Sequence, residues 1–174
     1  MQRFIQTTLV ACTLLAGSAH AEPGSHIGRR DSTPEDIAAI TRVTQDFRTA
    51  LSSKNAKLLS SLVLNGNILF DSPASPTRIK NVNDKLDVNF DGVQSGGYYG
   101  FAKFITESKL PVEEKFYNLK ITQDGHVAWV MFDFEFVEDN KIENYGVETW
   151  QMLKNADGKW KILSVVWSSH GAPK

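Results

Sequence analysis

The chain of 174 residues has a single cysteine, Cys12, and lacks the residue groupings that mark several enzyme classes. His26, His126 and His170 stand far apart, so no pair has the spacing of zinc ligands. The sequence contains no G-x-S-x-G nucleophile motif and no glycine-rich phosphate loop. It therefore does not indicate a zinc enzyme, a serine hydrolase or a nucleotide-binding protein, and we predict no cofactor.

A strong charge of either sign is also absent. The chain has 19 lysines and arginines against 20 aspartates and glutamates, a formal net charge of −1. A mixed surface of this kind predicts no binding to nucleic acid or to an anionic membrane, because both attract basic proteins. No segment approaches the run of about 20 apolar residues that crosses a bilayer.

The first 21 residues resemble a secretory signal peptide. Arg3 precedes an apolar stretch over 4–16, and small residues end at Ala21 in a typical cleavage site. We expect cleavage there, a mature chain that starts at Glu22, and a periplasmic or secreted protein. A lipoprotein anchored at Cys12 is the alternative, and the short apolar run before that residue disfavours it.

Cleavage after Ala21 would remove both Cys12 and Arg3. The formal charge would then be about −2, and neither disulfides nor thiol chemistry would be available. The remaining length of about 150 residues is typical of one domain. We predict a flexible leader over 22–32, a single domain over 33–170 and a short tail over 171–174.

Helical patterns dominate the first half of this domain. Thr33 and Pro34 form an N-cap and a first helical position, and apolar residues from Ile37 to Leu51 then recur at helical spacing. A second short helix is predicted over 55–63, a brief strand over 67–70, and a further helix over 98–108.

The segment 71–97 is rich in Asn, Asp, Pro and Gly and is predicted to be a long loop. Connections of this length are usually functional or mobile. Asp87, Asn89 and Asp91 match the first half of an EF-hand loop, whose twelfth position should be glutamate and is Tyr98 here. An ordinary Asn/Asp-rich turn is therefore favoured, with a weak calcium site as the alternative.

Four antiparallel strands are predicted to follow, over 115–122, 127–137, 145–153 and 160–168. The second strand places Phe132, Phe134 and Phe136 on one face and Trp129, Met131 and Val137 on the other. The last strand is predicted to place Ile162 and Val166 on one face and Leu163, Val165 and Trp167 on the other. Both faces of the sheet need cover. Helices can cover one face, and we predict that a second copy of the protein covers the other, in a homodimer.

This order of elements resembles the nuclear transport factor 2-like (NTF2-like) superfamily. The resemblance is carried by the ending around Trp160 and Ser168, and the segments 114–118 and 145–148 are similar to its SnoaL-like or lumazine-binding branch. It implies an α+β cone, with N-terminal helices packed on a strongly curved antiparallel sheet around a hollow interior. Val166 and Ser164 stand where many relatives carry histidines, which weakens a catalytic interpretation of the last strand.

Glu148 is the best single candidate for chemistry. It shares a strand face with Trp150, so a carboxylate inside an apolar cone could anchor a ligand or act as a general base. The alternative is a buried acid paired with a backbone donor or with Arg42 or Arg48. Asp133 and Glu135 form a second candidate acid–base pair, for which a solvated strip is the favoured interpretation.

The predicted ligand is a small apolar or aromatic molecule, held by pocket residues Phe70, Tyr98, Phe134, Trp150 and Trp167. For Tyr98 and its neighbour Tyr99, core packing of one ring and exposure of the other is favoured. Three functions stay open. The protein could be a binding protein without a reaction, an isomerase, dehydratase or cyclase that uses a pocket carboxylate, or an interaction module that acts through 71–97.

Overall fold

The computed structural model describes residues 24–93 and 97–172, so the predicted signal peptide and part of the leader and tail lie outside the described residues. The helices are α1 (Pro34–Ser52), α2 (Ala56–Leu62), α3 (Pro76–Lys85) and α4 (Tyr98–Glu107). The strands are β1 (Leu69–Asp71), β2 (Val112–Gln123), β3 (Val127–Glu138), β4 (Lys141–Lys154), β5 (Trp160–Trp167) and β6 (His170–Gly171).

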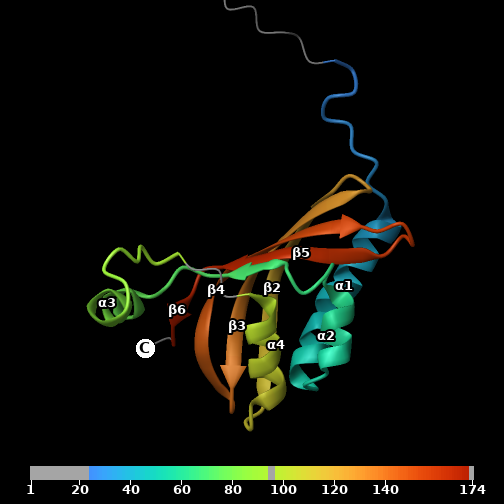
Figure 1. The fold of residues 1–174 in the computed structure, drawn as a ribbon. Coiled ribbons are helices and arrows are strands. Elements are labelled where there is room, and N and C mark those ends of the chain that lie inside the picture. Colours follow the sequence, from blue (N-terminus) through green and yellow to red (C-terminus); the bar gives the residue numbers. More distant parts are fainter. Residues whose placement is uncertain (1–23, 94–96, 173–174) are drawn as a thin grey trace, which may run out of the picture.

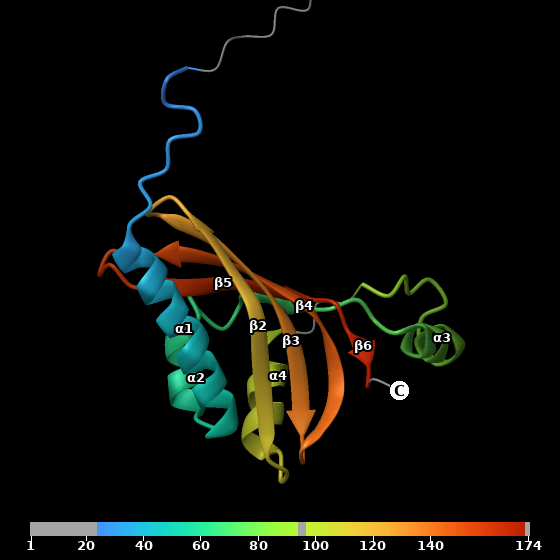
Figure 2. The same cartoon turned by 180° about the vertical axis from the view of Figure 1, so that it is seen from behind.

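One sheet organises the molecule, with strand order β1-β5-β4-β3-β2 and β6 paired to β4. All neighbouring strands are antiparallel except β1, which runs parallel to β5. The sheet is curved; α1 and α2 lie together along one side of it, and α4 lies across its inner face (Figures 1 and 2). The predicted α+β architecture is confirmed. Within the described residues, no helix is long and apolar enough to cross a membrane.

The first turn of α1 is fixed by a local cap and by side chains from β4 and β5. Thr33 caps the helix, with its hydroxyl oxygen accepting the Asp36 N–H at 3.1 Å, and Pro34 occupies the first turn. The buried Asp36 carboxylate then accepts the Trp160 indole N–H at 2.9 Å and pairs with Lys154 at 2.7 Å. This network joins α1 to β4 and β5.

The core lies between the helices and the inner face of the sheet. Trp150 has no exposed surface and contacts Phe47 and Phe132, with ring centroids 5.0 and 5.3 Å away. Along β3, buried and exposed side chains alternate, and Phe132 and Phe134 are buried whereas Trp129 is 63% exposed. The alternation predicted for this strand is confirmed from Trp129 to Phe136, where successive side chains point to opposite faces. It is wrong for Val137, which was predicted on the outer face and is buried, because the register with β4 shifts between Phe136 and Val137.

The faces predicted for the last strand are partly wrong. Ile162 and Val165 are both fully buried, although a regular strand would point them to opposite faces. Ile162 pairs with Met152 and Ser164 pairs with Gln151, which leaves Leu163 as an extra residue in β5. This β-bulge reverses the alternation, so Val166 is turned outward and is 37% exposed.

The segment 71–97 is not the structureless loop that its composition predicts. It contains α3, capped by Ser75, whose hydroxyl oxygen accepts the Arg78 N–H at 3.2 Å. None of the residues of α3 is buried. The helix stands beyond the sheet, on the side of β6 and away from α1 and α2 (Figures 1 and 2). It forms because its cap and first-turn proline supply a local start signal that the surrounding turn residues obscure.

The end of β5 requires a glycine on β4. A side chain at Gly146 would place its Cβ 2.4 Å from the backbone oxygen of Ser168. With glycine there, the Ser168 N–H donates to Val147 at 2.9 Å and its hydroxyl accepts the Val147 N–H at 3.0 Å. Ser168, which carries the sequence resemblance, therefore fastens the end of β5 to β4.

We expect Asp36→Asn to lower the free energy of unfolding at pH 7, because an amide cannot balance the Lys154 ammonium. Hydrogen bonds from Lys154 and then Trp160 hold the pKa of the Asp36 carboxyl below its ordinary value of 3.8. The ionised form therefore stabilises the fold above that pH, and this contribution is lost as the pH falls. Urea unfolding of both proteins at pH 7 and pH 3 should show a difference that shrinks in acid.

Asp46→Asn is the control for this change, since Asp46 lies on the same helix. Within the described residues its side chain makes no ion pair or hydrogen bond. An equal loss of stability in the two variants would contradict the role given to Asp36.

Candidate functional site

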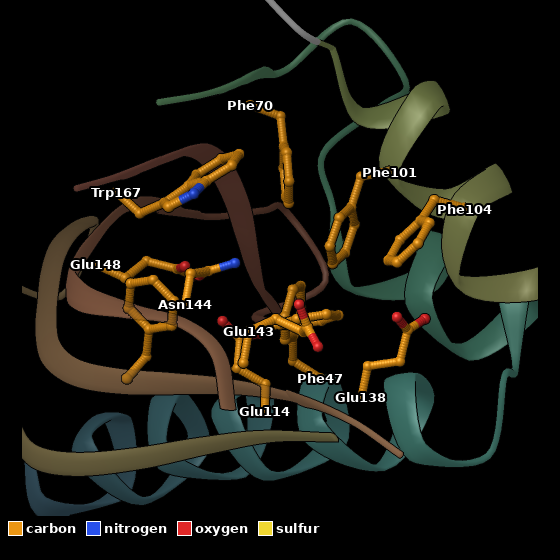
Figure 3. A pocket seen from close by; sticks show the side chains of 12 residues that line it. Phe47, Phe70, Phe101, Phe104, Glu114, Glu138, Glu143, Asn144, Glu148 and Trp167 are labelled. Atoms are coloured by element: carbon orange, nitrogen blue, oxygen red, sulfur yellow. The ribbon is translucent and has the colours of Figure 1, made fainter. Parts of the chain in front are cut away.

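A cavity of about 330 Å³ lies between α4 and the inner face of the sheet. Six phenylalanines, one tryptophan, four glutamates and one asparagine line it: Phe47, Phe70, Phe101, Phe104, Phe134, Phe136, Trp167, Glu114, Glu138, Glu143, Glu148 and Asn144. They come from α1, from α4 and from the strands β1 to β5. Figure 3 shows the rings of Phe70, Phe101 and Phe104 along one side of this hollow.

The aromatic rings form a continuous wall. Phe70 lies at the centre, with ring centroids 4.6 Å from Phe101 and 5.2 Å from Trp167. Phe47 extends the wall from α1 and stacks on Phe101 at 6.2 Å. Rings packed against one another lose little freedom when a ligand arrives, so the wall is a preformed apolar surface.

Glu148 enters the cavity from β4 and is only 4% exposed. Its carboxylate accepts the Trp150 indole N–H at 2.5 Å, so its partner is a tryptophan and not an arginine. Burial raises the pKa of Glu148 to about 8, although the bond from Trp150 acts in the opposite direction. Near neutral pH this group therefore holds a proton that it can release.

A second buried acid, Glu114, enters from β2 and was not among the sequence candidates. It is 5% exposed, and burial together with the nearby Glu148 raises its pKa well above the ordinary 4.5, while Arg48 acts in the opposite direction. The predicted strand begins at Lys115, whereas β2 begins at Val112, so the prediction left Glu114 outside the strand. Extending the alternation back through Phe116 and Glu114 to Val112 would have placed this acid on the inner face.

The pair of acids sets what the site can do. Burial raises the pKa of both carboxyl groups, so each can donate a hydrogen bond in its protonated form and accept a proton in its ionised form. Within the described residues, no group of three or more His, Cys, Asp or Glu side chains could hold a metal ion. The chemistry open to these residues is hydrogen bonding, ion pairing and proton transfer.

No family profile matches the sequence, and no curated protein matches it. Solved structures do. A protein from Planctomyces limnophilus superposes with a TM-score of 0.60 at 14% identity, over 79% of this chain and 98% of that one. An NTF2-like protein from Shewanella baltica gives 0.57 at 12% identity, over 81% and 99%. A scytalone dehydratase-like protein from Novosphingobium aromaticivorans gives 0.56 at 16% identity, over 80% and 87%.

The chain has the NTF2-like fold. The expected cone with helices on a curved sheet is thereby confirmed, and the cavity described above is the interior of this NTF2-like cone. Identities this low establish the fold alone, so the similarity to the SnoaL-like or lumazine-binding branch stays a prediction.

The NTF2-like cone brings some of the predicted pocket residues together and places others behind its wall. Phe70, Phe134 and Trp167 line the cavity. Trp150 and Tyr98 do not line it, since both are buried in the core and Tyr98 shares a hydrogen bond of 2.9 Å with Ser60. Trp150 acts on the site through its bond to Glu148.

The two tyrosines at the start of α4 follow the favoured interpretation. Tyr98 is 3% exposed and Tyr99 is 68% exposed. Their spacing on the helix separates them by about 100°, which turns one ring to the core and the other to solvent.

Asp133 and Glu135 do not belong to the cavity. They lie on the outer face of β3, where Asp133 accepts a hydrogen bond from Asn118 at 2.5 Å and Glu135 accepts one from Tyr117 at 2.9 Å. Alternation along the strand points them away from Phe134 and its neighbours. This position fits the favoured interpretation of the two residues as a solvated strip and not the alternative of an acid–base pair, and the acid near Glu148 is Glu114.

The weak calcium candidate lies after α3. The Asp87 and Asp91 side chains accept backbone N–H bonds from Asn89 and Val93, each at 2.9 Å. Side chains that close their own turns in this way are typical of an Asn/Asp-rich turn. A calcium site at Asp87, Asn89 and Asp91 stays a prediction.

We expect Glu148→Gln to stabilise the protein in alkaline solution. The folded state holds the Glu148 proton up to about pH 8, whereas the unfolded chain loses it near 4.5, so stability falls as the pH rises between these values. At pH 8 the free energy of unfolding of the variant, measured with urea, should exceed that of the native protein by on the order of 2–4 kcal/mol. At pH 5 the difference should be much smaller. Glu107→Gln, an exposed acid on α4, is the control, and an equal gain there would contradict the assignment.

Proposed function

We propose that this NTF2-like protein binds a small, largely apolar or aromatic molecule in the cavity between α4 and the sheet, without a reaction of its own. The observation that carries the proposal is an aromatic wall enclosing about 330 Å³. Pockets for small molecules usually have volumes of roughly 300–1,000 Å³, with mostly apolar walls and a few well-placed polar groups. Glu114 and Glu148 supply such groups here.

A second candidate is acid–base catalysis of the isomerase, dehydratase or cyclase type. The raised pKa of about 8 at Glu148 favours it, because a general base or acid works best with a pKa near the working pH. The fold shared with a scytalone dehydratase-like protein is compatible with this candidate. Since one fold hosts many functions, it does not choose between binding and catalysis.

Binding can be tested with the neutral dye N-phenyl-1-naphthylamine, whose fluorescence rises in apolar surroundings. We expect the native protein to bind it, and we expect Asn144→Trp to weaken binding at least tenfold, because an indole would fill the cavity that Asn144 lines. Trp129→Ala, on the outer face, should bind as the native protein does. Equal dye binding by Asn144→Trp and the native protein would contradict the proposal.

Native mass spectrometry of protein purified from its own host separates the two candidates. A molecule that co-purifies and is lost on denaturation is expected of a binding protein. If the native protein converts that molecule and Glu148→Gln holds it unchanged, catalysis is the function. Circular dichroism of the variant establishes that its fold is retained.

Export to the periplasm or the outside of the cell is also a proposal, supported by the signal-like pattern of residues 1–21.

A second proposal concerns assembly. We infer that two copies pair through the outer face of the sheet, because it carries several large apolar side chains at least a third exposed: Val127, Trp129, Met131, Val147 and Val166. Solvent contact of such a patch is costly, and pairing two copies would bury it.

Analytical ultracentrifugation tests the pairing. We expect the native protein to sediment as a dimer and Trp129→Glu to sediment as a monomer, because a buried unpaired charge at an interface is strongly unfavourable. Leu86→Glu, which places the same charge on an 84% exposed residue beside α3, should leave the dimer intact. If Leu86→Glu instead produces monomers, the segment 71–97 is the contact surface, as in the interaction-module alternative.

A further inference from the structure

All ionisable side chains in the lining of the NTF2-like cavity are acids. Glu114, Glu138, Glu143 and Glu148 line it, together with Asn144, and no lysine, arginine or histidine does so in the part of the chain that the structure describes. Among the described lining residues an anionic ligand would find no cationic side chain, so it would lose its hydration without a compensating ion pair. A cationic ligand would find several possible counterions.

Glu114 is the group that most needs a partner. It is 95% buried, since only 5% of it is exposed, yet among the described residues its carboxyl group makes no hydrogen bond and no ion pair. The nearby Arg48 is engaged elsewhere, because its Nε donates to the backbone oxygen of Glu114 at 3.0 Å and its guanidinium lies 5.9 Å from the Phe116 ring centre. Among the described residues no side-chain oxygen is both sealed from solvent and unpartnered, so the Glu114 carboxyl is open to the cavity it lines. Because buried polar groups are normally hydrogen-bonded, a ligand in the cavity can fill this open position.

Glu148 also has an oxygen that can accept a hydrogen bond from a ligand. One oxygen of Glu148 accepts the Trp150 indole N–H, and no other bond to this side chain occurs among the described residues. Glu148 is close enough to Glu114 to raise the pKa of the Glu114 carboxyl. A single positive charge between them would relieve the repulsion of both.

The wall opposite these acids suits the rest of such a ligand. The ring centroid of Phe70 lies 4.6 Å from that of Phe101 and 5.2 Å from that of Trp167. Aromatic faces attract cations as well as apolar rings, most strongly where water is excluded. In Figure 3 the rings of Phe70 and Phe101 lie on the far side of the hollow from Glu114.

We propose that the ligand of this cavity is an organic cation, a protonated amine or a quaternary ammonium on an aromatic or apolar body. Its charged group lies between Glu114 and Glu148, and its body lies against the aromatic wall. This inference rests on the proposed binding function and names the class of ligand.

Proton release accompanies binding in this scheme. Burial raises the pKa of both acids, and that of Glu148 to about 8, so an arriving cation favours their ionised forms and displaces protons to solvent. The other charged groups near the pair are Arg48 on α1, Glu138 on β3 and Glu143 on β4. Affinity for a cation should therefore rise as the pH increases from 6 to 8, whereas affinity for a neutral analogue should not.

Three probes of one skeleton test the charge. Isothermal titration at pH 7.5 with 1-naphthylmethylamine, 1-naphthalenemethanol and 1-naphthoic acid compares a cation, a neutral molecule and an anion of similar size. We expect the amine to bind at least tenfold more tightly than the alcohol, and the acid not to bind. Titration of the amine in two buffers of different ionisation enthalpy should reveal protons released to the buffer.

Glu114→Gln and Glu148→Gln should each abolish most of the preference for the amine over the alcohol. The affinity of each variant for the alcohol should stay that of the native protein. Glu107→Gln, an exposed acid on α4 outside the cavity, should retain the full preference. If the alcohol binds as tightly as the amine to the native protein, the cation inference is overturned and the binding function stands. If none of the probes binds and the neutral dye does not bind either, the proposed binding function itself fails.

Discussion

The structure depends on the hydrogen bond between the Trp150 indole and the Glu148 carboxylate. Trp150 fills the centre of the core, packed by Phe47, Phe116 and Phe132, and has no exposed surface. Its N–H must find an acceptor inside the protein, because a buried donor without one is costly. The acceptor two residues away on the same strand face meets this need at 2.5 Å. The acceptor that Trp150 requires is therefore also an acid that lines the cavity, Glu148.

A second tryptophan–carboxylate pair in the same protein shows what the missing cation changes. Trp160 donates to Asp36, which is also buried, but there Lys154 completes the site and the pKa of the carboxyl is lowered. At Glu148 no such counterion is present among the described residues, and the pKa is raised to about 8. The first pair is a structural clamp between α1 and the sheet. The second pair has no cation among the described residues, and in our proposal a ligand is the partner that supplies one.

The shape of the sheet decides where that partner can lie. Curvature separates the inner faces of β2 and β4 from α4, and rings from β1, β5 and α4 close the hollow without filling it. Acids buried here reduce stability at neutral pH, because the unfolded chain ionises them freely. Such a loss of stability is typical of functional sites, whose residues are often not the ones that would stabilise the fold most.

Much of this protein follows from its sequence, because helix caps and strand alternation are local properties of the backbone. Thr33 and Pro34 start α1 as predicted, β3 alternates as predicted from Trp129 to Phe136, and the shared face of Glu148 and Trp150 needs only their spacing of two. Other features depend on contacts between distant segments. The bulge at Leu163 is set by pairing with β4, and the neighbourhood of Glu114 and Glu148 arises because β3 lies between their strands in a curved sheet. The sequence alone determined most of the elements and one acid, whereas only the tertiary structure decided that a second acid lies near it in an aromatic cavity, since no local pattern records the distance between strands.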